Sequence, residues 1–480
     1  MQQPAESLTD KSLKRSVLLA SAFAAFLTPF LGSAINLALP AIGKDLNATA
    51  LELGWIASSF ILSSAIFLLP FGRLADIVGR KKIFSCGIIL FTISTSLIIF
   101  SWNIISLIIF RVIQGIAGAM IFGTSLAILT SVFVPGERGR AMGINTTAVY
   151  TGLSSGPVIG GLLTQYFGWR SIFIFLLPVG IISIYLVFNK INHEWAEAKG
   201  EKFDWAGSLI YGLTLASFMY GFSKLPSYTG WIFLGCGFIF GILFLLFEKK
   251  ISNPVFDIRL VLKNRVFAFS GIAALIHYSA TSAIGFFISL YLQYLKGLDA
   301  QAAGFIMISQ PVMMALLSPL AGRLSDKYNP GIIASLGMAL TAVGLILLCF
   351  INASSSISLI IFLLVLMGAG FGLFSSPNSN AIMSSVEKKH LGIASGVIGT
   401  MRMIGQMMSM GIAMMLLALF IGQKEIAPDT FPGLISAMKT GFLIFSVLCI
   451  AGIFASLARS GKLLDSSTIK NPVKNEILKK

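Results

Sequence analysis

The side chains that could carry charge chemistry in this chain lie inside long apolar segments. Arg111, His277 and Arg402 each fall well within such a segment. An arginine near the centre of a membrane helix costs at least about 2.5–3.5 kcal/mol unless it faces protein or water, and histidine titrates close to neutral pH. We therefore take these three residues as candidates for proton coupling or for binding a charged substrate.

Two of these candidates, Arg111 and His277, also have a purely structural interpretation. Arg111 lies about 12 Å along its helix from one end, and a long side chain there can reach toward the lipid headgroups. His277 is alternatively a neutral packed residue that is hydrogen-bonded to Tyr278 or to a backbone carbonyl. None of the 19 acidic residues lies in the middle of an apolar segment, so the sequence predicts no carboxylate at the centre of the membrane.

The composition defines the class of protein that holds these residues. The chain has 480 residues, of which 56% are hydrophobic and only 11% charged, with a mean hydropathy of +0.88. Soluble proteins are about a quarter charged. The net charge of +16 does not indicate a nucleic-acid partner, because the basic residues lie between apolar segments. We predict an all-α integral membrane protein without a metal or cofactor.

About 20 apolar residues cross the hydrocarbon core of a bilayer as a helix, and the chain offers fourteen such segments. They lie roughly at residues 16–42, 53–71, 83–101, 104–131, 141–163, 171–189, 205–223, 230–247, 267–293, 301–321, 332–351, 357–383, 391–421 and 435–458. Lys and Arg are concentrated in the loops on the side of both termini. The positive-inside rule assigns that side to the cytoplasm, so we expect a plasma-membrane protein with both termini cytoplasmic.

Two similar polar loops divide the chain into related halves. The string Gly72-Arg-Leu-Ala-Asp76 returns 250 residues later as Gly322-Arg-Leu-Ser-Asp326. We therefore predict two six-helix halves related by an axis along the membrane normal, with two inserted helices between them. The expected domains are the N-terminal bundle at 1–190, the inserted helices and linkers at 191–264, the C-terminal bundle at 265–460 and a cytoplasmic tail at 461–480.

The first of these loops carries the most specific pattern in the chain. It reads G-x-L-A-D-x-x-G-R-K-K from Gly72 to Lys82 and resembles the signature loop of the major facilitator superfamily. A basic loop that only sets the topology would need neither the glycines nor the aspartate. The resemblance implies a conformational latch formed by Gly72, Asp76, Gly79 and Arg80, with a weaker copy at Asp326.

Two further motifs extend this resemblance over essentially the whole chain. Arg111 belongs to an L-x-x-x-R-x-x-Q-G string similar to the family motif whose arginine is linked to proton coupling or substrate charge. A G-x-x-x-G-P-x-x-G-G string is similar to the motif of the superfamily's antiporters and comprises Gly152, Gly156, Pro157, Gly160 and Gly161.

With fourteen apolar segments, the chain resembles the fourteen-span drug:proton antiporter family. That family usually carries an aspartate in its first span, and Leu31 occupies the aspartate's place here. The resemblance implies proton exchange, and His277 is the candidate that could carry the proton instead.

A methionine-rich segment and sparse polar groups predict a substrate pocket. Methionine is flexible and polarisable, so it suits a surface that repacks around varied apolar ligands, although ordinary packing is the alternative. The apolar candidates are Met403, Met407 and Met410, and the polar candidates are Asn36, Asn145, Tyr150, Gln310, Asn378 and Asn380. We expect Arg111, His277 and Arg402 to line one central cavity.

These features favour a monomeric secondary transporter, surrounded by lipid, that exports apolar or amphipathic small molecules by proton antiport and alternating access. Two buried arginines without a buried carboxylate keep a second interpretation open, which is an exporter or uniporter of organic anions or metabolites. A membrane receptor or enzyme is a remote alternative, because the sequence has no nucleophile motif, metal cluster or paired carboxylates at membrane depth. We therefore do not expect an enzyme.

Overall fold

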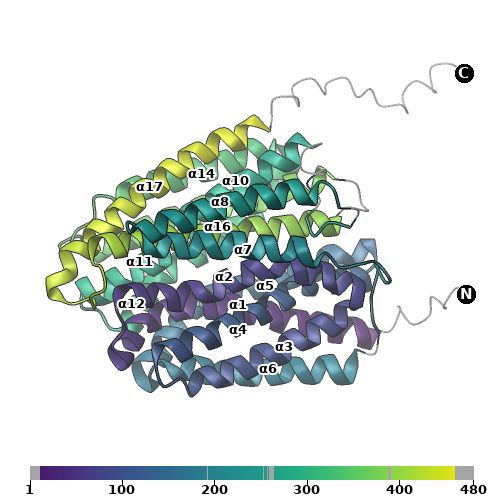
Figure 1. Ribbon diagram of the computed structural model, residues 1–480, viewed down its shortest axis with the longest axis horizontal. Coiled ribbons are helices and arrows are strands. Elements are labelled where there is room, and N and C mark those ends of the chain that lie inside the picture. The colour runs from purple at the N-terminus through teal and green to yellow at the C-terminus, as the bar shows by residue number, and fades with distance from the viewer. Residues whose placement is uncertain are drawn as a thin grey trace, which may run out of the picture.

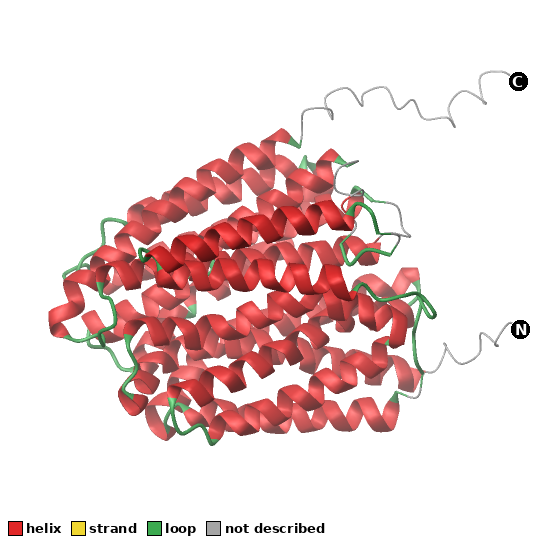
Figure 2. Cartoon of the chain, viewed as in Figure 1, coloured by secondary structure: helices red, strands yellow, loops and turns green. Residues whose placement is uncertain are grey.

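The computed structural model describes residues 11–191, 193–251, 253–256, 258, 264–386 and 391–459. Within these ranges the chain forms helices and no strand. Helices satisfy their own backbone hydrogen bonds, which a bilayer requires. They run side by side, with the loops at the two ends of the bundle (Figure 1; Figure 2). The expected tail at 461–480 lies outside the described residues.

The first part of the chain forms eight long helices. They are α1 Lys11–Leu46, α2 Ala50–Val78, α3 Arg80–Ile99, α4 Ile104–Val132, α5 Pro135–Phe167, α6 Arg170–Lys190, α7 Trp205–Lys224 and α8 Tyr228–Glu248. The second part is more segmented. Its elements are α10 Arg265–Thr281, α11 Ile284–Leu290, η2 Tyr291–Leu295, α12 Ala300–Met307, α13 Ser309–Lys327, α14 Pro330–Leu348, α15 Ile357–Ser384, α16 Leu391–Phe420, η4 Pro428–Thr430 and α17 Phe431–Ala458.

Polar side chains in the short loops define where several helices begin. Thr49 and Glu52 form a capping box at the start of α2, each accepting a hydrogen bond from the backbone amide of the other. Asn103 Oδ1 accepts a hydrogen bond from the backbone amide of Ser106 at 2.8 Å at the start of α4. Because the first amides of a helix have no partner within it, these caps stabilise the helix starts next to the loops.

Twelve helical segments among the described residues are long and apolar enough to cross a membrane. Helices α5 and α7 are absent from that set because glycine, serine and tyrosine lower their apolar character. Both lie within the bundle, α5 against α1 and α7 against α8. The predicted all-α membrane fold is therefore confirmed, whereas the predicted number of fourteen spanning helices is not.

Two groups of helices flank the pair α7 and α8. Helices α1–α6 pack mainly on one another and are called the N half below, while α10–α17 form the C half. Helix α7 packs on α8 and also contacts α2 of the N half and α16 of the C half. One hydrophobic core cluster extends through both halves. The inserted pair thus contacts each half mainly through α7.

The described chain starts and ends at the same end of the bundle, near Lys11 and Ala458 (Figure 1). We call this end the terminus side and the opposite end the far side. The turn between α2 and α3 and the linker between α6 and α7 lie on the terminus side, whereas the turn between α7 and α8 lies on the far side.

Candidate functional site

The two halves are hydrogen-bonded to each other toward the far side. Ser289 Oγ of α11 donates a hydrogen bond to the backbone carbonyl of Asn36 in α1 at 2.5 Å. Ser58 Oγ of α2 donates to Met414 Sδ of α16 at 3.3 Å. Asn36 lies near the end of α1 and Ser58 near the start of α2, and the turn between these two helices is on the far side, so these contacts join the halves away from the terminus side.

Helix α5 reaches both halves through its glycine and proline string. Three of its glycines pack against α1 of the same half, and these are Gly152, Gly156 and Gly160. Gly161 faces the C half, where an added Cβ would collide with the backbone carbonyl of Ala300. A Cβ on Gly304 of α12 would likewise collide with the carbonyl of Pro157. The string therefore permits backbone contact between the halves, because no side chain separates α5 from α12 there.

Arg402 lies in the middle of α16, between the halves. Its guanidinium carbon is 5.4 Å from the ring centroid of Phe122 in α4, and its Nε is buried without a hydrogen-bond partner. Tyr150 of α5 shares a 2.8 Å hydrogen bond with Ser318 of α13 and lies within electrostatic range of Arg402 and Tyr278. We call these five residues the Arg402 cluster. Among the described residues, no carboxylate forms an ion pair with Arg402.

Arg111 lies inside the N half instead. Its side chain is 1% exposed. Nε donates to the backbone carbonyl of Ile56 at 3.3 Å, and one terminal nitrogen donates to Gln114 Oε1 at 2.9 Å. The guanidinium also lies 4.8 Å from the ring centroid of Phe60. Arg111 is thus enclosed by α2 and α4 of its own half and does not share a surface with Arg402.

His277 lies inside the C half and is fully buried. Its ring stacks on Phe374 with the centroids 4.0 Å apart, and the centroid of Phe371 is 5.1 Å away. Neither ring nitrogen has a hydrogen-bond partner, so the bond to Tyr278 or to a carbonyl, which the alternative structural interpretation required, is not formed. The expectation that Arg111, His277 and Arg402 line one cavity is wrong, because two of the three are packed within separate halves.

Of the remaining pocket candidates, those at the boundary between the halves are Asn36 and Tyr150. Asn145 of α5 is half-buried, and its Oδ1 has no partner. Gln310 of α13 is half-buried, and its backbone carbonyl lies against Gly368. The methionines Met403, Met407 and Met410 are buried in the core cluster that extends through both halves. These methionines therefore have the packing role that the sequence left as an alternative.

Asn378 belongs to a polar cluster at the terminus side of the C half. Its amide donates to the backbone carbonyl of Ser270 at 3.1 Å, and its Oδ1 accepts from Arg459 at 2.7 Å. Arg459 also donates to Ser270 Oγ at 2.9 Å and to the carbonyl of Pro330 at 3.1 Å. Burial lowers the pKa of Arg459 to about 10, so it stays protonated at neutral pH. The cluster ties α10, α14 and α15 to the end of α17.

The loop between α2 and α3 forms a compact ionic cluster. Arg80 donates to Asp76 Oδ1 at 2.8 Å and to the two carboxylate oxygens of Glu197 at 2.7 and 2.9 Å. Gly79 has φ of 132°, which strongly favours glycine, and an added Cβ would lie 2.5 Å from Glu194 Cδ. Gly72 has open space at the Cβ position. The linker between α6 and α7 thus packs directly on this loop.

The second copy of this loop has weaker contacts. Asp326 Oδ1 accepts a 3.2 Å hydrogen bond from Asn380 Nδ2, whose amide also donates to Ser325 Oγ. The described residues show no ion pair at Asp326 comparable to that between Asp76 and Arg80. The two loops are therefore unequal in their bonding.

The acidic residues of the linker between α6 and α7 also contact the basic loop, and the sequence did not predict this role. Besides accepting from Lys81 N at 2.8 Å, the carboxylate of Glu194 accepts from Lys82 N at 3.2 Å, so it caps the start of α3. Glu201 forms an ion pair with Arg73. The sequence contained one indication of this role, because the linker carries three glutamates, at 194, 197 and 201, close together. Only the fold shows that they contact the basic loop between α2 and α3.

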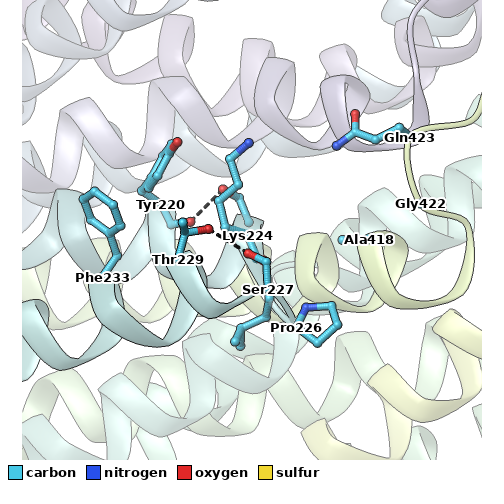
Figure 3. A pocket seen from close by; sticks show the side chains of 11 residues that line it. Tyr220, Lys224, Pro226, Ser227, Thr229, Phe233, Ala418, Gly422 and Gln423 are labelled. Atoms are coloured by element: carbon cyan, nitrogen blue, oxygen red, sulfur yellow. Dashed lines mark hydrogen bonds between the residues drawn. The ribbon is translucent and has the colours of Figure 1, made fainter.

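A separate cleft of about 690 Å³ lies on the far side, between the turn joining α7 to α8 and the loop after α16. Figure 3 shows Tyr220, Lys224 and Gln423 around it. Lys224 Nζ is 5.6 Å from the Tyr220 ring centroid. None of the site residues predicted from the sequence lines this cleft.

Comparisons with known proteins agree with this architecture. The profile of the Major Facilitator Superfamily matches residues 21–409 and 270–476. A riboflavin transporter, RibZ of Clostridioides difficile, is 31% identical over 80% of this chain and 84% of its own length. The tetracenomycin C resistance and export protein of Streptomyces glaucescens is 26% identical over 86% of this chain and 77% of its own length.

A solved structure shares the fold at low sequence identity. It is a bacterial homologue of the human lysosomal transporter Spinster, with a TM-score of 0.70, 17% identity and coverage of 95% of this chain and 99% of that one. The multidrug resistance protein Stp of Mycobacterium tuberculosis is 28% identical over 81% of this chain and 73% of its own length.

Proposed function

The chain belongs to the Major Facilitator Superfamily and is an integral membrane transporter of small molecules, not an enzyme, and we propose that it exports apolar or amphipathic compounds by alternating access. In this proposal the N and C halves rock about the substrate site, α5 and α7 also cross the membrane, and the terminus side is cytoplasmic. We also propose that the protein lies in the plasma membrane as a monomer with fourteen membrane-spanning helices.

The Arg402 cluster is the observation that carries this proposal. It lies in the middle of the bundle and takes residues from both halves. A group at that position changes its surroundings when the halves move relative to each other, which a substrate site in alternating access requires. Phe122 and Tyr278 supply aromatic surface and Arg402 supplies charge, as expected for a mostly apolar pocket with few polar groups.

We further propose that export is driven by proton exchange through His277. The ring lies at membrane depth with both nitrogens free of hydrogen bonds, and it is next in sequence to Tyr278 of the Arg402 cluster. An intramembrane ionisable group is a functional candidate by default. Relatives named for drug export or multidrug resistance support the export role.

Transport in proteoliposomes with an imposed pH gradient tests the coupling. His277→Ala is expected to lose the stimulation by the gradient while retaining substrate counterflow, because the pocket around Arg402 is unchanged. His193→Ala, an exposed linker histidine, serves as the matched control. Full gradient-driven transport by His277→Ala would exclude His277 as the proton carrier.

A second candidate function is the transport of organic anions, by export or by uniport. The specific observation that favours it is the absence of an ion-paired carboxylate on Arg402 among the described residues, since a half-buried cation without a carboxylate partner attracts a substrate anion. The relatives differ in their named substrates, from riboflavin to tetracenomycin C, so the charge of the substrate is argued from the Arg402 cluster. Comparing a lipophilic cation with a lipophilic anion in the same vesicles separates the two functions.

A further inference from the structure

Two carboxyl groups that the transport proposal does not use are buried together where the inserted helices meet the terminus side. Asp204 precedes the first residue of α7, and Glu248 is the last residue of α8. The two residues are 7% and 2% exposed. Carboxylates are rarely buried to this degree unless they are paired with a cation or hydrogen-bonded.

Each carboxyl group is satisfied on one oxygen only. Asp204 Oδ1 accepts a 2.9 Å hydrogen bond from the backbone amide of Gly207, and Glu248 Oε2 accepts a 3.3 Å hydrogen bond from the amide of Phe256. The other two oxygens, Asp204 Oδ2 and Glu248 Oε1, are buried without a hydrogen-bond partner. Asp204 Oδ2 and Glu248 Oε1 therefore each still require a hydrogen-bond donor.

These two oxygens face each other across Gly207. A Cβ added there would collide with Asp204 Oδ2 and lie 2.7 Å from Glu248 Oε1, so both oxygens border the same small volume. Glycine at this position leaves room for a direct contact between the carboxyl groups. Two ionised carboxylates in such a contact repel each other and neither can donate a hydrogen bond.

No basic side chain among the described residues forms an ion pair with either group. Lys202 in the linker and Lys249 and Lys250 after α8 are exposed. On α2, which packs against α7, Arg73 pairs with Glu201, and Asp76 pairs with Arg80. On α16, Arg402 is directed to Phe122. The positive charge that would stabilise two carboxylates is therefore not supplied by the charged groups of the packed elements.

We propose that Asp204 and Glu248 form a proton-binding pair in which one shared proton joins Glu248 Oε1 to Asp204 Oδ2. The proton converts one acceptor into a donor, so the two unpartnered oxygens satisfy each other and the pair carries one negative charge instead of two. That remaining charge is stabilised by the amides of Gly207 and Phe256. The pair is distinct from the Arg402 cluster and from His277.

A metal cation fits this site less well than a proton. Calcium requires six to eight oxygen ligands, whereas no group of three or more His, Cys, Asp or Glu side chains within the described ranges could hold a metal. The two amide donors also direct positive charge toward the carboxyl groups, which disfavours a nearby cation.

The shared proton fastens the start of α7 to the end of α8. Helix α7 contacts both halves, since Tyr211 Oη donates to the Ala65 carbonyl of α2 at 3.0 Å and Phe222 lies against Gly411 of α16. Loss of the proton would separate Asp204 from Glu248 by repulsion and loosen the base of the helix that lies between the halves. The site thus links the protonation of the terminus side to the packing of α7.

Infrared spectroscopy of the full-length protein in lipid at neutral pH tests the shared proton directly. Wild type is expected to show the C=O stretch of a protonated carboxylic acid, and Glu248→Gln is expected to lack that component, because the amide donates to Asp204 without needing a proton. Glu52→Gln, a helix-capping glutamate on the far side that stays in its capping box as glutamine, is expected to leave the band unchanged.

Thermal unfolding provides the second readout. Glu248→Gln is expected to keep the wild-type midpoint, because its amide imitates the protonated acid, whereas Glu248→Ala lowers it by leaving Asp204 Oδ2 buried without a partner. Adding Na⁺ or Ca²⁺ is expected to change neither. An unchanged carboxylic-acid band in Glu248→Gln, or a cation-dependent stabilisation of wild type that Glu248→Gln loses, would overturn the proposal.

Discussion

Arg402 differs from the other two intramembrane candidates in what surrounds it. Arg111 is bonded to Gln114 and a backbone carbonyl inside the N half, and His277 is stacked between phenylalanines inside the C half. Arg402 instead lies between the halves with a buried Nε that has no partner. A half-buried group at the boundary between the halves is accessible to a substrate, whereas Arg111 and His277 are each enclosed inside one half.

Substitution of Arg402 should therefore act on substrate recognition. Arg402→Ala is expected to reduce transport of a lipophilic organic anion by roughly tenfold to a hundredfold, since a hydrogen bond to a charged group contributes about 1.5–3 kcal/mol. Arg402→Lys is expected to retain part of the activity. Uptake of matched anionic and cationic probes into inverted vesicles measures both effects, and an equal loss for the two probes would show that Arg402 supports the fold rather than the charge preference.

The direction in which each charged side chain points was only partly predictable from the sequence. The energetic cost of a buried arginine predicted that Arg111 and Arg402 face the inside of the bundle. Arg111 is buried inside the N half, and Arg402 lies half-buried between the halves. The sequence did not indicate which partner each would meet, because the N half is closed around Arg111 by Gln114 and Ile56, which lie on different helices. The stacking of His277 on Phe374 also depends on a helix distant in sequence.

At the scale of elements, the linker between α6 and α7 acts as part of the loop between α2 and α3. Glu197 shares the guanidinium of Arg80 with Asp76, and Glu194 caps α3. The sequence motif predicted the residues on one side of this cluster but not the linker that covers them. The spacing of a motif indicates only the geometry near it. The linker docks on this loop only in the assembled bundle, since Glu197 lies 117 residues after Arg80.

The two copies of the loop should differ in their importance for transport. Asp76→Ala is expected to reduce the transport rate more than Asp326→Ala, because Asp76 is ion-paired to a buried arginine, while Asp326 accepts a hydrogen bond from the neutral Asn380 amide and has no ion pair among the described residues. Initial rates in vesicles, at matched expression, measure this. Equal or reversed losses would contradict the assignment of the latch to the N half.

For the whole molecule, the loop repeat in the sequence predicts two six-helix halves related by an axis along the membrane normal, and this relation stays a prediction. The contacts between helices group α1–α6 and α10–α17. The repeat did not predict which ends of the halves touch. Hydrogen bonds join the halves toward the far side, at Ser58 with Met414 and at Ser289 with Asn36, and in the middle of the bundle, at Tyr150 with Ser318. The number of spanning helices could not be fixed from the sequence, because α5 and α7 pack in the bundle but are less apolar than the other helices.

In the proposed transport cycle, the far side of the two halves must open and close around the Arg402 cluster. A disulfide between Ser58→Cys and Met414→Cys, in a protein whose Cys86, Cys236, Cys349 and Cys449 have been replaced, would lock the far side closed. Oxidation is expected to abolish transport, a reductant is expected to restore it, and neither single variant is expected to respond. Transport at the full rate by the completely cross-linked protein would contradict this cycle.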